Sequence, residues 1–243
     1  MNGISLKKPP LMATIFALLA LIILCKLGLW QIERLHWKLD ILARLDAAYA
    51  KAGPDSPPLD FSKADQDDFL YGKVQGIWRP GKVLLLGPRV KDGKIGADVI
   101  APLQMADGRE ILINLGWSGE KDKTRLPIYA DKGRRVVFSG LARKMDWNAF
   151  TPDNRPDKDE WYKPDIAEIA AVKGLRDPLP LFLFADYSSA KLGGGLPDNE
   201  RWQPRNEHLN YAIFWFSMAG VLAVIFTLRF VVVWPPAREA QVN

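Results

Sequence analysis

Two long apolar segments stand near the ends of a chain that is otherwise polar. Residues 11–30 and 211–233 hold almost no charged side chains. Each segment approaches the ~20 residues that a helix needs to cross ~30 Å of hydrocarbon. Residues 31–206 between them carry most of the charge. The pattern therefore predicts two transmembrane helices that flank one large polar domain.

The first apolar segment is predicted to be a retained anchor, because no small-x-small cleavage site follows it directly. Pro235 and Pro236 end the second segment, since proline cannot continue a helix. We expect five regions. The N-terminus over residues 1–10 is cytoplasmic, and a first transmembrane helix covers residues 11–30. A periplasmic domain over residues 31–206 follows, then a second transmembrane helix over residues 207–234 and a cytoplasmic tail over residues 235–243.

The orientation of the chain in the membrane and the type of membrane are predicted from weaker signals. Lysine and arginine flank both apolar segments on both sides, so the positive-inside rule does not choose an orientation. Long translocated loops are exempt from that rule, and we therefore place the large domain outside the cytoplasm. The N-terminus lacks the Arg- and Ser-rich composition of a transit peptide, which favours a bacterial inner (plasma) membrane.

Short apolar runs separated by turn residues predict a β-rich domain. Helical spacing first continues the anchor past residue 31, as far as the Pro-rich linker at residues 53–58. Strands are then predicted at residues 69–78, 83–86, 97–104, 110–117, 135–141 and 180–187, and a short helix at residues 164–172.

Three turns, at residues 79–82, 91–94 and 106–109, are predicted to close hairpins. The predicted fold class is therefore an α+β membrane protein, in which the two transmembrane helices flank an antiparallel meander or a small barrel with one short helix.

Charge and cysteine content exclude several function classes. Lysine and arginine number 33 against 28 aspartates and glutamates, and no dense basic stripe marks a nucleic-acid partner. The single cysteine, Cys25, excludes an internal disulfide framework and a thiolate metal cluster. No nucleophile elbow, zinc-protease pair or phosphate loop is present. We therefore expect a binding protein and not an enzyme.

The two histidines, His36 and His208, both lie close to an apolar segment. Imidazole at that depth can ligate haem iron or copper, or can simply anchor a helix at the interface. His36 shares a helical face with two carboxylates and is expected to face water. His208 begins a stripe with Tyr211 and Trp215, so a ligand role and a packing role both stay open.

A second group near the membrane surface combines a cation with two indoles. Trp30, Arg34 and Trp37 follow an i, i+4, i+7 spacing, which stacks the guanidinium between the rings. This stack is either an interfacial anchor or one wall of a site shared with the base of the second helix.

Five motifs follow one another along the chain. They read Gly28-Leu-Trp-Gln-Ile-Glu-Arg-Leu-His-Trp-Lys38, Gly87-Pro-Arg89, Gly96-Ala-Asp-Val-Ile-Ala-Pro102, Ile111-Leu-Ile-Asn-Leu-Gly-Trp117 and Glu207-His-Leu-Asn-Tyr-Ala-Ile-Phe-Trp-Phe216. In this order they resemble the motifs of the surfeit locus (Surf/Shy) family of cytochrome c oxidase assembly factors. Two positions depart from the family pattern, since Leu115 replaces an arginine and Glu207 replaces an asparagine.

The resemblance implies a membrane protein that helps to insert or protect haem a in oxidase subunit I. It also implies haem binding by the histidine at the position of His208, as in bacterial members. We expect His208 to be a transient axial ligand of the haem iron and Arg34 to pair with a propionate. Tyr211, Trp215 and Trp30 are expected to form apolar walls around the macrocycle.

The expected partners are oxidase subunit I, the haem a synthesis machinery and the lipid bilayer. Two other functions compete with haem capture. One is a structural chaperone that clamps subunit I without touching haem. The other is a membrane-anchored hydrolase, which the absence of a recognisable nucleophile in the sequence disfavours.

Overall fold

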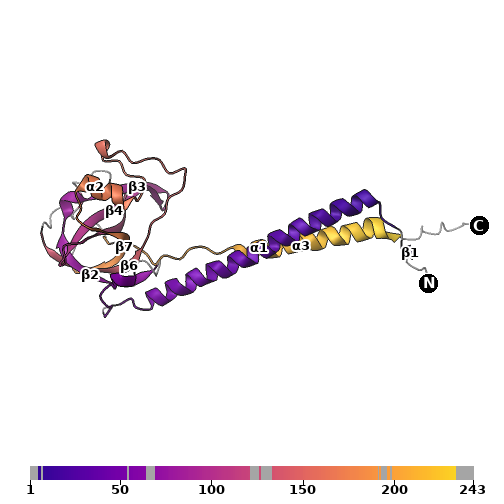
Figure 1. The fold of residues 1–243 in the computed structure, drawn as a ribbon, viewed down its shortest axis with the longest axis horizontal. Coiled ribbons are helices and arrows are strands. Elements are labelled where there is room, and N and C mark those ends of the chain that lie inside the picture. The colour runs from indigo at the N-terminus through magenta and orange to yellow at the C-terminus, as the bar shows by residue number, and fades with distance from the viewer. Residues whose placement is uncertain are drawn as a thin grey trace, which may run out of the picture. The chain divides into compact units, whose positions relative to one another are not determined.

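The computed structural model describes residues 5–6, 8–53, 55–63, 69–120, 126, 133–190, 192, 196–197 and 199–233. The chain divides into two compact units (Figure 1). The helical unit comprises Met1–Leu42 and Pro204–Asn243, and the barrel unit comprises Ala43–Gln203.

The helical unit is built on two long helices that lie side by side (Figure 1). Helix α1 (Leu11–Tyr49) begins in this unit, and α3 (His208–Phe226) is extended by one π-helical turn, η6 (Thr227–Val231). A short antiparallel pair, β1 (Ser5–Leu6) with β8 (Val232–Val233), joins the far ends of the unit. By length and composition both helices qualify as membrane spans, and little of their apolar windows is buried within the protein.

Small residues allow α1 and α3 to approach closely. A β-carbon built on Gly28 would lie 2.7 Å from Cζ of Phe216, which is closer than real side chains pack. On α3, Ala212 and Ala219 are buried. Small side chains at a helix crossing let the two backbones come into contact, as they do in pairs of membrane helices. The prediction that the first helix continues well past residue 31 is confirmed, because α1 ends only at Tyr49.

The strands of the barrel unit form one six-stranded sheet in the order β2-β6-β7-β5-β4-β3, and β2 also pairs with β4. This extra pairing closes β2, β6, β7, β5 and β4 into a ring, so of the two predicted architectures the structure has the small barrel. The strands are β2 (Leu70–Trp78), β3 (Leu84–Lys91), β4 (Lys94–Met105), β5 (Glu110–Ser118), β6 (Arg135–Arg143) and β7 (Pro178–Ser188).

The hairpin predicted at residues 79–82 is wrong. Strands β2 and β3 do not pair with each other, and a 3-10 turn, η2 (Pro80–Lys82), links them. Both pair with β4, since Trp78 lies opposite Leu103 and Leu84 opposite Ile100. They therefore follow one another along β4. Alternating polarity predicts a strand but does not say which neighbour it pairs with, and this is why the turn was misassigned.

The sheet is mixed, which differs from the antiparallel meander that was the other predicted architecture. Strands β5 and β7 run parallel, with Leu112 opposite Phe182. Strand β6 follows β5 in the sequence but lies between β7 and β2 in the sheet. The chain therefore crosses over before it returns beside β5. The hairpins at residues 91–94 and 106–109 are confirmed, because β3 pairs with β4 and β4 with β5.

Strand β5 shows why several strands read as nearly continuous apolar runs. Ile111, Ile113 and Leu115 belong to the main core cluster. Leu112 belongs instead to a second cluster, together with Trp161. Both faces of the strand are thus covered, which removes the polar alternation that a half-exposed strand would show. The barrel consequently has an inner core and an outer apolar layer.

The outer layer is completed by the short helix α2 (Ile166–Lys173), which confirms the helix predicted at residues 164–172. The side chain of Asp165 caps it by accepting from the backbone N–H groups of Ala167 and Glu168, at 3.0 and 3.1 Å. Gly174 ends the helix in the left-handed region, with φ of 61°. Ile169 is fully buried against the barrel.

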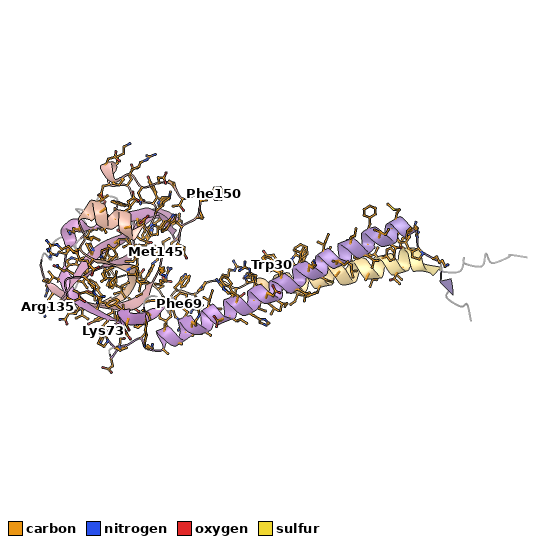
Figure 2. All side chains as sticks on the ribbon, in the orientation of Figure 1. Trp30, Phe69, Lys73, Arg135, Met145 and Phe150 are labelled. Carbon is orange, nitrogen blue, oxygen red and sulfur yellow. The ribbon has the colours of Figure 1, made fainter. Side chains whose placement is uncertain are left out.

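The segments that lead into and out of the barrel unit lie against each other. The backbone N–H of Trp202 donates to the hydroxyl of Tyr49 at 2.9 Å. The guanidinium carbon of Arg143 lies 4.3 Å from the ring centroid of Trp202 and 4.0 Å from that of Phe184. Phe69, labelled in Figure 2, packs on the Trp202 ring with centroids 5.7 Å apart. These contacts fasten both connecting segments to the barrel wall.

Closure of the barrel requires a glycine at position 76. A β-carbon on Gly76 would collide with the carbonyl group of Gln104 on β4. We expect Gly76→Ala to lower the free energy of unfolding by about 1–3 kcal/mol, the usual cost of forcing extra atoms into a packed site. Urea denaturation of the full chain in detergent, followed by near-UV circular dichroism, measures this loss.

Gly81→Ala is the matched control, because nothing lies within 4 Å of a β-carbon built there. The two variants should therefore differ clearly in denaturation midpoint. Equal midpoints would show that β2 and β4 do not approach as closely as the structure indicates.

Candidate functional site

His208 is the first residue of α3, and its imidazole faces α1. The Nδ1 atom of His208 lies 2.8 Å from Oε1 of Gln31, and the two residues are 177 positions apart in the chain. Only 8% of Gln31 is exposed, and His208 is half-buried. An amide oxygen can only accept, so Nδ1 donates in this bond. In the neutral imidazole, the other ring nitrogen, Nε2, then carries the free lone pair.

Tyr211 and Trp215 follow His208 at helical spacing on α3. Trp215 is half-buried and meets Phe214 edge-on, with ring centroids 5.2 Å apart. Tyr211 is 54% exposed. Helical periodicity places both rings on the side of α3 that carries His208. The structure therefore puts the imidazole at the end of an aromatic stripe, as its spacing predicted.

The stack of Trp30, Arg34 and Trp37 on α1 is confirmed. The Arg34 guanidinium carbon lies 5.8 Å from the ring centroid of Trp30 and 5.3 Å from that of Trp37. All three side chains are exposed, and Figure 2 labels Trp30 on α1. Among the described residues, no hydrogen bond, ion pair or ring contact joins this stack to His208. The two groups are separate features of the helical unit.

Two other sequence candidates have no comparable setting. His36 is exposed on α1, as its neighbours in the sequence predicted, and Cys25 is a half-buried free thiol on the same helix. Within the described part of the chain, no group of three or more His, Cys, Asp or Glu side chains could hold a metal ion. A single imidazole with an oriented ring is the arrangement that the structure does provide.

Sequence reasoning did not single out Gln31 as a site residue. In the sequence it is one position of the first family motif. Its role could have been inferred from spacing, because Gln31 lies three residues after Gly28 and so shares the helical face that packs on α3. A polar residue on that packed face needs a partner, and His208 supplies it.

The N-terminal end of α3 also carries a charged rim. Glu207 accepts from Nε of Arg205 and from the side-chain amide of Asn210, both at 2.6 Å. The hydrogen bond to Glu207 raises the pKa of Arg205. The three residues line a hollow of about 480 Å³ together with the rings of Tyr211 and Phe214. Glu207, a departure from the family pattern, thus organises this rim.

The middle motifs meet within the barrel unit. Nε of Arg89 lies 3.3 Å from the Asp98 carboxylate, and the Trp117 indole donates to the Arg89 carbonyl at 3.2 Å. Burial raises the pKa of Asp98, although the charge of Arg89 opposes that shift. Leu115, which stands in place of an arginine in the family pattern, is fully buried in the barrel core. An apolar side chain fits that position because no water reaches it.

Comparison with known proteins covers both halves of the candidate site. The sequence profile described as the SURF1 family matches residues 18–220, a range that includes Gln31 and His208. Surfeit locus protein 1 of Homo sapiens is 28% identical over 224 residues, covering 84% of this chain and 73% of that protein. The protein of the same name in Mus musculus is 28% identical over 224 residues, with 84% and 71% covered.

A third relative shows the same extent of similarity. The SURF1-like protein of Monosiga brevicollis is 30% identical over 218 residues, covering 84% of this chain and 82% of that protein. Because the family profile matches most of its length and a 30% identical relative is covered to 82%, this chain belongs to the SURF1 family.

Proposed function

We propose that this protein is a membrane-anchored assembly factor of cytochrome c oxidase that holds haem a transiently while it is inserted into subunit I. The observation that carries the proposal is the hydrogen bond between His208 and Gln31, which leaves Nε2 of the imidazole free to donate its lone pair. The oxidase context comes from the resemblance of the five motifs to oxidase assembly factors.

The residues around His208 fit a haem group. A bound haem would supply an iron that could take an imidazole nitrogen as a ligand. His208 offers that nitrogen, and Tyr211 and Trp215 offer aromatic walls on the same helix. Arg34, held between the indoles of Trp30 and Trp37, is the proposed partner of a propionate. The protein thus binds and shields the haem, and it carries out no chemical conversion.

The proposed location is the inner membrane of a bacterium. Helices α1 and α3 have the length and composition of spans. Gln31 directly follows the first apolar segment, and His208 precedes the second by three residues, so both lie at the same surface of the bilayer. With both termini cytoplasmic, His208 and the barrel unit are periplasmic. Subunit I and the haem a synthesis machinery are the proposed partners.

The topology can be tested with enzyme fusions. Alkaline phosphatase fused after Gly93, in an exposed turn of the barrel unit, should be active because it reaches the periplasm. A fusion after Val242 should be inactive, since it stays in the cytoplasm. The measurement is phosphatase activity in intact cells, normalised to the amount of fusion protein. The reverse pattern would place His208 on the cytoplasmic side and contradict the proposal.

Haem capture is tested by His208→Ala, in a host that makes haem a. Alanine preserves helix propensity, so the variant should accumulate to normal levels. We expect its haem content after purification to fall at least about tenfold, because an axial ligand is lost. His36→Ala is the control and should keep its haem, since His36 is exposed elsewhere on α1. Trp30→Ala and Arg34→Ala should show smaller losses.

The same experiment decides between haem capture and the structural clamp. If wild-type protein carries no haem in that host, or if His208→Ala keeps a full complement with an unaltered visible spectrum, ligation by His208 is wrong. Co-purification of subunit I with the haem-free protein would then support the clamp.

A further inference from the structure

Among the described residues of the helical unit, Gln31 is the only polar residue that is buried. The other buried polar residues all lie in the barrel unit, and they are Ser56, Glu110, Asn114 and Ser139. Gln31 sits one residue after the apolar segment and points its side chain at His208. A buried amide is costly unless its hydrogen bonds are made, so its presence at this position calls for a physical reason.

We infer that Gln31 is a positioning residue for His208, which holds the imidazole with its proton on Nδ1 and its lone pair on Nε2. This inference rests on the proposed function, because it names the group that prepares the haem ligand. Residues that ligate metals through imidazole almost always donate the other ring N–H to an oxygen acceptor, and this partner fixes the tautomer and the ring orientation. Here the acceptor is Oε1 of Gln31, at 2.8 Å.

The surroundings of the bond keep its geometry constant. Gly28 lies one turn before Gln31 on α1, and the Phe216 ring packs directly on it. Ala212 lies one turn after His208 on α3 and is 1% exposed. The two helix backbones are therefore in close contact beside the hydrogen bond. A side-chain hydrogen bond between two closely packed helices orients the imidazole ring, since packing constrains the torsion angles of both side chains.

The bond also distinguishes His208 from the other histidine. His36 lies on the same helix as Gln31 but is exposed, and no hydrogen bond among the described residues selects one of its tautomers. Oriented imidazole is thus a property of one position only among the described residues. Gln31 therefore fixes the tautomer and the ring orientation of His208 already in the haem-free protein.

The tautomer can be measured on the haem-free protein. In a His36→Gln background, His208 is the sole histidine of the chain, because the sequence contains two. Full-length protein labelled with ¹⁵N-histidine, in detergent and alkaline buffer, should show a protonated Nδ1 and an unprotonated Nε2. Gln31→Met removes the acceptor at similar size, and we expect the spectrum to relax to a mixture of the two tautomers.

Gln31→Glu is the conservative variant, because an ionised carboxylate can only accept a hydrogen bond. It should keep the Nδ1-protonated tautomer. If Gln31→Glu shifts the proton to Nε2 in part or in full, or if Gln31→Met leaves the wild-type tautomer unchanged, the positioning role is wrong.

Haem binding gives the second readout, with hemin as the probe titrated into each purified variant. Gln31→Met should weaken hemin binding roughly tenfold to a hundredfold, as loss of such an oriented partner usually does. Gln31→Glu should retain binding and lower the midpoint potential, since a charged acceptor makes the imidazole a stronger donor. Glu33→Met is the matched control at an exposed position of α1 and should bind as wild type does.

The two proposals fail in different ways. If His208→Ala binds hemin as tightly as wild type, the proposed function is wrong, whatever the tautomer of His208. If His208→Ala loses hemin but Gln31→Met retains full affinity and potential, His208 is a ligand and Gln31 has only a structural role in helix packing.

Discussion

The hydrogen bond from Trp202 to Tyr49 holds together the two segments that connect the barrel unit to the rest of the chain. An ion pair between Arg201 and Asp46 lies beside it. The chain must therefore leave the barrel next to the place where it enters. Tyr49 is the last residue of α1, and Trp202 lies six residues before α3 begins at His208.

Arg143 joins the barrel wall to the segment that contains Trp202. Its guanidinium packs against the rings of Phe184 and Trp202, and its buried Nε has no hydrogen-bond partner among the described residues. Burial lowers the pKa of Arg143. The aromatic faces supply the attraction that water would otherwise provide, and the stem of the side chain packs as an apolar group. One cation thus joins β6, β7 and the outgoing segment, at the cost of an unmade hydrogen bond.

The helical unit also buries polar groups, and there they are paired with each other. Gln31 and His208 are polar residues on faces that pack together, and each supplies what the other lacks. Arg34, in contrast, faces outward and relies on the two indoles of its own helix. A polar group between helices needs a specific partner and thereby becomes fixed, whereas a group on the outer face remains free to meet a ligand. The unit therefore separates the oriented imidazole from the exposed cation.

The sequence by itself determined the elements that depend on local chemistry. Apolar length predicted both long helices, the short helix was expected at residues 164–172, and short apolar runs between turn residues located the six strands of the barrel sheet. Spacing along one helix also predicted the stack at Arg34, because residues four apart are neighbours on any helix.

Only the tertiary structure decided which strands and which helix faces meet. The collinear run of β2 and β3 along β4 and the parallel pairing of β5 with β7 depend on partners distant in sequence, and polarity patterns carry no record of partners. Gln31 illustrates the same limit at the site. Its residue type and position were visible in the sequence, but its hydrogen bond to His208 exists because two helices separated by the whole barrel unit come into contact.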